Sequence, residues 1–156
     1  LCLMDLSENT EESWKTLVKN NPHLRSLTLS GCNLSGNIPD DLSDLRYLTH
    51  LNLSKNRFSS IPDTISNLPA LTHLDLGSNW IHALPDNFYL LKTLIHLDLS
   101  NNYYKNATIT PLLNLLHDSN LEHVDLRHNK HITPIPTEAD IQILMDKPKT
   151  RPCTIL

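Results

Sequence analysis

Glycine, cysteine and long apolar runs are scarce in this sequence, and each scarcity argues against a class of protein. Three glycines in 156 residues leave no glycine-rich loop of the kind that holds phosphate groups. No apolar run approaches the roughly 18 residues that a membrane-spanning helix needs. The formal net charge is −4, which is a poor match to nucleic acid because nucleic-acid-binding domains present basic faces.

The three cysteines, Cys2, Cys32 and Cys153, are too few for the clusters of disulfide bonds that stabilise many small secreted domains. We therefore expect a reducing compartment, with the side chain of Cys32 buried. Asn-x-Ser/Thr sequons keep an extracellular location open nevertheless. They begin at Asn33, Asn52 and Asn106.

The pattern Leu-x-x-Leu-x-Leu-x-x-Asn recurs along the chain. Its six copies begin at Leu1, Leu24, Leu48, Leu71, Leu94 and Leu121. Their ninth residues are Asn9, Cys32, Asn56, Asn79, Asn102 and Asn129, with steps of 23, 24, 23, 23 and 27 residues between them. With this pattern and a period in the twenties, the chain resembles the leucine-rich-repeat superfamily.

The resemblance implies an α/β solenoid, shaped like a horseshoe, with six repeats. Short parallel strands would form its concave sheet, and 3₁₀ or short helical segments its convex side. Because strand side chains alternate, positions 4 and 6 of each copy point into the core and positions 3, 5 and 7 face solvent. The ninth residue turns inward to hydrogen-bond the backbone. Residues 34–39 are similar to plant-type repeats, whereas Ile61-Pro62 and Leu84-Pro85 are similar to the short intracellular and bacterial types.

We divide the chain into repeats over residues 1–132, a helical cap over 133–146 and a flexible basic tail over 147–156. Apolar residues at helical spacing predict helices near Thr10–Asn20 and Thr110–Asp118. The segments that lead from the ninth position of one copy to the start of the next are here called returns. The other returns carry Leu-Pro-Asp or Ile-Pro-Asp. Because proline fixes φ and removes a hydrogen-bond donor, we expect turns or short 3₁₀ segments there.

Two columns of polar residues are predicted on the concave face. Position 3 is histidine in four consecutive copies: His50, His73, His96 and His123. Position 5 of the same copies is Asn52, Asp75, Asp98 and Asp125. One interpretation is a zinc or proton-sensing site, but a column lacks the tetrahedral convergence that zinc prefers. The other interpretation is the ordinary polar inner face of this family.

We therefore predict no metal and no cofactor, and assign the four histidines and three aspartates, together with Arg127, to partner binding. Acidification would make the net charge of the two columns together more positive, because imidazoles titrate near neutral pH. Partner binding should therefore change between about pH 5 and 7.

Position 10 is Arg57, Trp80, Tyr103 and Lys130 in successive copies. Trp80 and Tyr103 should lie beside each other at one edge of the sheet, whereas Tyr104 is expected in the core. Exposed tryptophan and tyrosine often dominate binding energy at interfaces, so Trp80 and Tyr103 are candidate partner-binding residues. The alternative is that Trp80 only packs on the neighbouring loop.

The last four residues, Cys153-Thr-Ile-Leu, fit the C-a-a-X prenylation signal. Lys147, Lys149 and Arg151 lie just upstream and would attract anionic lipid. We predict that a host prenyltransferase modifies Cys153 and that the protein is cytoplasmic and peripheral on a membrane. A chance cysteine four residues from the end is the alternative.

Together these features favour a non-enzymatic protein-binding module tethered to a membrane. The mixed repeat types, the many asparagines and the tail resemble leucine-rich-repeat effectors that intracellular bacteria inject into host cells. A second interpretation is an extracellular recognition or inhibitor module. A third is the targeting domain of a larger enzyme, such as a leucine-rich-repeat ubiquitin ligase. The sequence indicates no catalytic residues, no small-molecule substrate and no nucleic acid.

Overall fold

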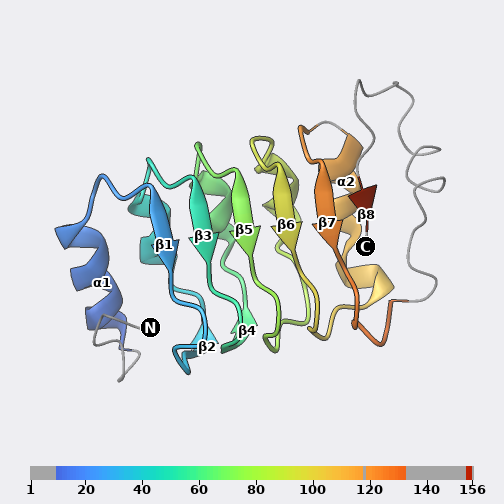
Figure 1. The fold of residues 1–156 in the computed structure, drawn as a ribbon, viewed down its shortest axis with the longest axis horizontal. Coiled ribbons are helices and arrows are strands. Elements are labelled where there is room, and N and C mark those ends of the chain that lie inside the picture. Colours follow the sequence, from blue (N-terminus) through green and yellow to red (C-terminus); the bar gives the residue numbers. More distant parts are fainter. Residues whose placement is uncertain (1–9, 118, 133–153, 156) are drawn as a thin grey trace.

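The repeats form a short solenoid whose parallel strands lie side by side (Figure 1). The computed structural model describes residues 10–117, 119–132 and 154–155. In the main sheet the strand order is β1-β3-β5-β6-β7-β8, and a second sheet pairs β2 with β4. The main-sheet strands are β1 (Ser26–Thr28), β3 (His50–Asn52), β5 (His73–Asp75), β6 (His96–Asp98), β7 (His123–Asp125) and β8 (Thr154–Ile155). The second sheet consists of β2 (Ser35–Asn37) and β4 (Arg57–Ser60).

The strand register follows the repeat. Position 3 of one copy pairs with position 3 of the next, as in His50 with His73, and position 5 pairs with position 5, as in Asp75 with Asp98. Residues at the same repeat position therefore form straight columns across the sheet. The leucine-rich-repeat architecture predicted from the sequence is confirmed.

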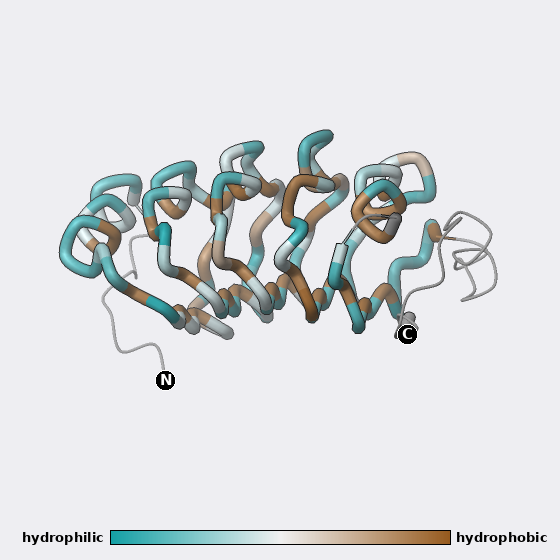
Figure 2. The backbone as a smooth tube through the Cα atoms, turned by 90° about the horizontal axis from the view of Figure 1, so that it is seen from above, coloured by the Kyte–Doolittle hydropathy of each residue, from teal (hydrophilic) through white to brown (hydrophobic). Residues whose placement is uncertain are grey.

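Helical returns cover the opposite side of the solenoid from the strands (Figure 2). The 3₁₀ segments η1, η2 and η3 each begin directly after a proline, which sets φ for the turn without needing a backbone donor. The predicted helices near residues 10–20 and 110–118 are present. The bounds are α1 (Glu11–Asn20), η1 (Asp40–Asp44), η2 (Asp63–Asn67), η3 (Asp86–Leu90), η4 (Asn106–Thr108) and α2 (Thr110–His117).

The core runs the length of the solenoid between the sheet and the returns. In the main-sheet strands β1, β3, β5, β6 and β7, the middle residue is buried and its neighbours on either side face outward. Large side chains from the returns close the other side of the core, among them Trp14 from α1 and Phe88 from η3. Tyr104 is fully buried, as its position after the repeat motif predicted.

In the copies that begin at Leu48, Leu71, Leu94 and Leu121, the asparagine at the ninth position links neighbouring repeats. The Asn79 amide nitrogen donates to the carbonyl oxygens of Leu53 and Leu76, both at 3.0 Å, and its oxygen accepts from the Phe58 N–H at 3.1 Å. Asn56 makes equivalent bonds one copy earlier. These bonds satisfy backbone groups that the loops would otherwise bury unpaired.

The eighth residue of each repeat, directly before the ninth-position residue, adopts a left-handed backbone conformation in every described copy. Its φ is 69° at Gly31, 56° at Lys55, 57° at Ser78, 52° at Asn101 and 62° at His128. This conformation reverses the chain after the strand, which lets the next side chain point into the core. Only glycine and asparagine among these residues tolerate the conformation readily, so Lys55, Ser78 and His128 are held there by the surrounding bonds.

Two sequence-based expectations need correction. Cys32 is disulfide-bonded and only partly buried, so it is not the buried free thiol that a reducing compartment implied; its partner lies outside the described residues. The tail was expected to be flexible, but Thr154–Ile155 pairs with His123 and Val124 as β8. The physical reason is that β7 would otherwise be an edge strand with unpaired backbone groups.

The first repeat copy (1–9), the predicted cap (133–146) and Cys153 lie outside the described residues. Within the described part of the chain, no helix has the length and apolar character needed to cross a membrane.

Candidate functional site

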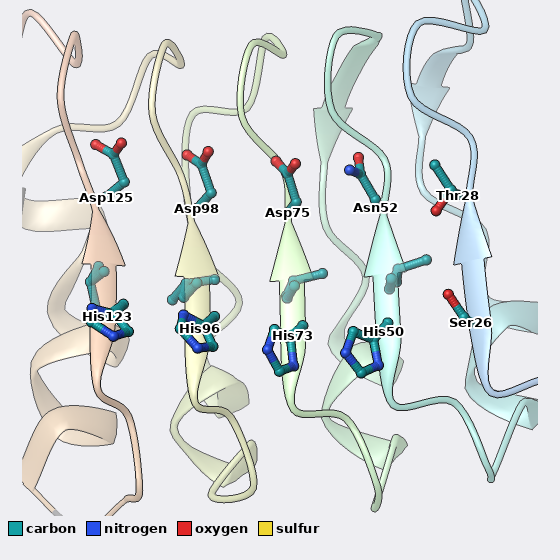
Figure 3. A pocket seen from close by; sticks show the side chains of 14 residues that line it. Ser26, Thr28, His50, Asn52, His73, Asp75, His96, Asp98, His123 and Asp125 are labelled. Atoms are coloured by element: carbon teal, nitrogen blue, oxygen red, sulfur yellow. The ribbon is translucent and has the colours of Figure 1, made fainter. Parts of the chain in front are cut away.

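The four histidines form a continuous stack on the concave face (Figure 3). Ring centroids are 4.2 Å apart between His50 and His73, 4.5 Å between His73 and His96, and 4.6 Å between His96 and His123, with interplanar angles of 12°, 25° and 14°. The hydroxyls of Thr49 and Thr72 lie 2.9 Å from the Nδ1 atoms of His50 and His73. The stacking follows from the parallel register, since each strand presents its histidine to the next.

The aspartate column lies one pleat away from the histidines, toward the carboxyl ends of the strands (Figure 3). Asp75, Asp98 and Asp125 each accept a hydrogen bond from the backbone N–H two residues ahead, at 3.0, 2.8 and 2.9 Å. Asn52 makes the same bond at 3.0 Å without a charge. The column therefore has a structural role at the strand ends, and that role needs an oxygen acceptor but not a carboxylate.

Arg127 belongs to this column because it holds Asp125. Its Nη2 donates to Asp125 Oδ2 at 2.6 Å, and its Nε lies 3.1 Å from both carboxylate oxygens. Burial by itself raises the pKa of Asp125, but the bonds and charge of Arg127 outweigh it, so the pKa is lowered overall. Asp75 and Asp98 have no such guanidinium partner among the described residues.

Burial and like charges act on the middle of both columns. Burial, followed by the charges of His50 and His96, lowers the pKa of His73. Burial is also the largest cause that raises the pKa of Asp75, and the charge of Asp98 adds to it. Burial and the stacked histidines therefore favour the neutral form of His73, and burial disfavours the charged form of Asp75.

The two columns line a shallow hollow of about 400 Å³. β1 extends both columns with Ser26 and Thr28, which also line the hollow (Figure 3). The sequence-based list omitted these two residues, although they occupy positions 3 and 5 of their copy. The imidazoles are stacked in parallel and do not converge. Among the described residues, no group of three or more histidine, cysteine, aspartate or glutamate side chains could hold a metal ion.

The aromatic pair lies at a different place from the columns. Trp80 and Tyr103 are 49% and 46% exposed and line a second hollow of about 480 Å³ with Lys130. Arg57 lies over the Trp80 ring with its guanidinium carbon 5.8 Å from the ring centroid. His82 stacks on Tyr103 at 5.3 Å, a contact that the repeat pattern did not indicate. The structure thus brings the predicted site residues into two groups rather than one.

The concave polar face and the stacked repeats define a solenoid of the protein-binding type. The chain matches the leucine-rich repeat region family over residues 5–133 and belongs to this family. No curated protein sequence matches it. Modules of this family usually have no catalytic activity and typically mediate protein–protein interactions.

Solved structures of bacterial and plant proteins are similar to this one. A leucine-rich-repeat protein of Leptospira interrogans has 27% identity and a TM-score of 0.70, over 94% of this chain and 35% of its own. The internalin InlF of Listeria monocytogenes has 28% identity and a TM-score of 0.63, over 84% and 36%. The ectodomain of the Arabidopsis receptor kinase HAESA, in complex with an IDA peptide hormone, has 32% identity and a TM-score of 0.63, over 72% and 19%. The chain thus spans about a third of the Leptospira protein.

Proposed function

We propose that the concave face of this solenoid binds an extended segment of a partner protein. The observation that carries the proposal is the partly exposed double column, in which stacked imidazoles lie beside a row of carboxylates over a shallow hollow. The stack offers flat, weakly polar surface, and the aspartates offer acceptors and negative charge. The HAESA ectodomain was solved with a peptide hormone, which supports peptide binding by this architecture.

The test uses a charge-neutral variant that keeps the strand ends intact. In the triple variant Asp75→Asn, Asp98→Asn and Asp125→Asn, each side chain still accepts the local backbone bond, as Asn52 does in the wild type. The matched control changes the same number of aspartates on the convex side: Asp40→Asn, Asp63→Asn and Asp86→Asn. Proteins captured from host-cell lysate by the wild type should be retained by the control and lost by the concave variant. Equal capture by both variants would remove the proposal.

For the cellular location, we propose that prenylation of Cys153 tethers the module to the cytoplasmic face of a host membrane, as in an injected bacterial effector. The C-a-a-X match and the basic residues Lys147, Lys149 and Arg151 support it, and so do bacterial structural relatives. The transferase needs the terminal residues extended in its own site, so the β8–β7 pairing has to open first. Intact mass of protein made in eukaryotic cells decides it: a Cys153 without isoprenoid contradicts the tether.

The disulfide at Cys32 favours a second candidate, an extracellular recognition module. Asn33 is exposed directly after that cysteine and opens a sequon. Plant receptor ectodomains are among the structural relatives. This candidate predicts an oxidised Cys32 and glycan at Asn33 or Asn106, whereas the tether predicts lipid without glycan. The same mass measurement therefore separates the two.

A further inference from the structure

The segments that follow the concave strands carry cations but no carboxylates. These segments, which we call the turn edge, are residues 29–39, 53–62, 76–85, 99–109 and 126–132. Their cations are Lys55, Arg57, Lys105, Arg127 and Lys130, and no Asp or Glu occurs among them. By contrast, the returns 40–47, 63–70 and 86–93 carry five aspartates against two cations. A protein with a net charge of −4 thus has one edge whose ionised groups are all cations, of which Arg127 is paired with Asp125.

The position-10 residues form an ordered row along this edge. Trp80 N–H donates to the Phe58 carbonyl at 2.9 Å, and Tyr103 N–H donates to the Ile81 carbonyl at 2.9 Å. Arg57 N–H makes the same bond to Leu34 at 2.7 Å. These repeated backbone bonds hold Arg57, Trp80 and Tyr103 at the strand spacing, and Lys130 lines the same hollow as Trp80 and Tyr103. We call the row Arg57, Trp80, Tyr103 and Lys130 the edge row.

The order of side chains in the edge row is cation, aromatic, aromatic, cation. All four side chains are exposed. Trp80, Tyr103 and Lys130 line the hollow described above, and Arg57 covers one face of the Trp80 ring. Among the described residues, no carboxylate lines that hollow. A ligand for such a row needs an aromatic or apolar group at its centre and a negative charge at each end.

We propose that the edge row docks an acidic, extended segment of a protein partner, with two carboxylates four residues apart and an aromatic side chain midway between them. Three strand steps of about 4.8 Å separate Arg57 from Lys130, roughly 14 Å in total. Four residues of extended chain span about 13 Å, and residues i, i+2 and i+4 point to the same side. A pattern of acid, any residue, aromatic, any residue, acid therefore matches both the length and the facing of the row. The inference rests on the proposed function only in that the partner is a protein.

A pair of peptides with equal composition tests the register. The matching probe is acetyl-Glu-Ser-Tyr-Ser-Glu-amide, and the control is acetyl-Ser-Glu-Tyr-Glu-Ser-amide, whose carboxylates point away from the tyrosine's side of the strand. Titration followed by NMR should show the matching peptide binding more tightly, with the largest shifts at the Trp80 indole and the Tyr103 amide. Equal affinities, or shifts confined to the histidine and aspartate columns, overturn the proposal.

Charge reversal tests the two ends of the row. Arg57→Glu and Lys130→Glu should each weaken the matching peptide about fivefold, as expected when an exposed ion pair becomes a repulsion. Arg46→Glu makes the same charge change at an exposed position on the return side and should leave binding unchanged. If phosphatidylserine vesicles bind in an Arg57- and Lys130-dependent way while the peptide does not, the edge row is a membrane surface and the proposal is wrong.

Binding of the matching peptide to the edge row should not depend on the concave face. The concave triple asparagine variant should bind the matching peptide as the wild type does. If the matching peptide does not bind, while the concave triple variant still fails to capture the partner from lysate, only the edge-row proposal fails. If the peptide binds while concave substitutions leave capture unchanged, the concave-face proposal fails instead.

Discussion

The buried asparagines at the ninth repeat position predict a specific loss of stability when one of them is replaced by alanine. Asn79 is 2% exposed, and its side chain serves three backbone groups at 3.0–3.1 Å. In Asn79→Ala the two carbonyls keep another amide partner, because Leu53 also accepts from Asn56 and Leu76 also accepts from Asn102. The Phe58 N–H loses its side-chain acceptor and is left buried.

The magnitude follows from that difference. One buried unsatisfied donor costs about 1–3 kcal/mol, and two lost hydrogen bonds whose acceptors stay partnered cost about 0.5–1.5 kcal/mol each. We expect Asn79→Ala to lower the free energy of unfolding by about 3 kcal/mol. Asn79→Asp should be worse at neutral pH, since it places a carboxylate against two carbonyl oxygens in the core.

Urea unfolding followed by circular dichroism measures both variants. The control is Asn114→Ala, which removes an exposed amide from α2 and should leave stability within about 0.5 kcal/mol of the wild type. A loss below about 1 kcal/mol in Asn79→Ala would refute the reasoning, because that value is within reach of an ordinary exposed hydrogen bond.

Three further predictions concern His73, Tyr104 and Ser78. The pKa of His73 is lowered by burial and by its stacked neighbours His50 and His96. As the pH drops below about 6.5, the unfolded chain therefore binds more protons than the folded protein does, and the free energy of unfolding decreases. The decrease in the urea midpoint from pH 7.5 to 5.5 should therefore be smaller in His73→Gln than in the wild type. An equal decrease in both proteins would contradict this role of His73. The buried Tyr104 hydroxyl has no hydrogen-bond partner among the described residues, so Tyr104→Phe should keep or raise the melting temperature; a clear fall would show that the hydroxyl is bonded. Ser78 has a φ of 57°, which costs a non-glycine residue about 1–2 kcal/mol, so Ser78→Gly should stabilise the protein by up to about 1 kcal/mol after glycine's entropic cost. Ser59→Gly in β4, where φ is not positive, should destabilise it.

The pH dependence of partner binding extends the same chemistry to the concave face. Protonation of His73, whose pKa is lowered by burial and by the charges of His50 and His96, adds positive charge to the concave face beside Asp75, and Thr49 and Thr72 hydrogen-bond two of the stacked rings. We expect the affinity of a captured partner to change between about pH 5 and 7. Surface plasmon resonance across that range checks it, and constant affinity would remove the histidine column from the interface.

Much of the fold could be predicted because the repeat fixes both burial and register. Once the leucines at positions 1, 4 and 6 are assigned to the core, stacking aligns His73 with His96 and Asp75 with Asp98 without further information. The prolines before η1, η2 and η3 likewise mark where each return turns. The site columns were predictable for this reason.

Other features depend on contacts that no single repeat contains. The left-handed conformation of Lys55 and His128 has no local signal, since neither residue favours it; the inward turn of the next asparagine imposes it. The pairing of β8 with β7 joins residues 31 positions apart, His123 and Thr154, and follows from an exposed strand edge rather than from sequence pattern. The Arg57–Trp80 and His82–Tyr103 contacts depend on side-chain choices in neighbouring copies.

Site-specific photocrosslinking tests the central claim, that the concave face is the binding surface, most directly. A photoreactive residue replaces His96 in the middle of the histidine column, and in a second protein it replaces Asn67, which is exposed on η2 at the convex side. After irradiation with the captured partner, the adduct should form from position 96 and not from position 67. Adducts from position 67 alone, or equal yields from both positions, would contradict the account.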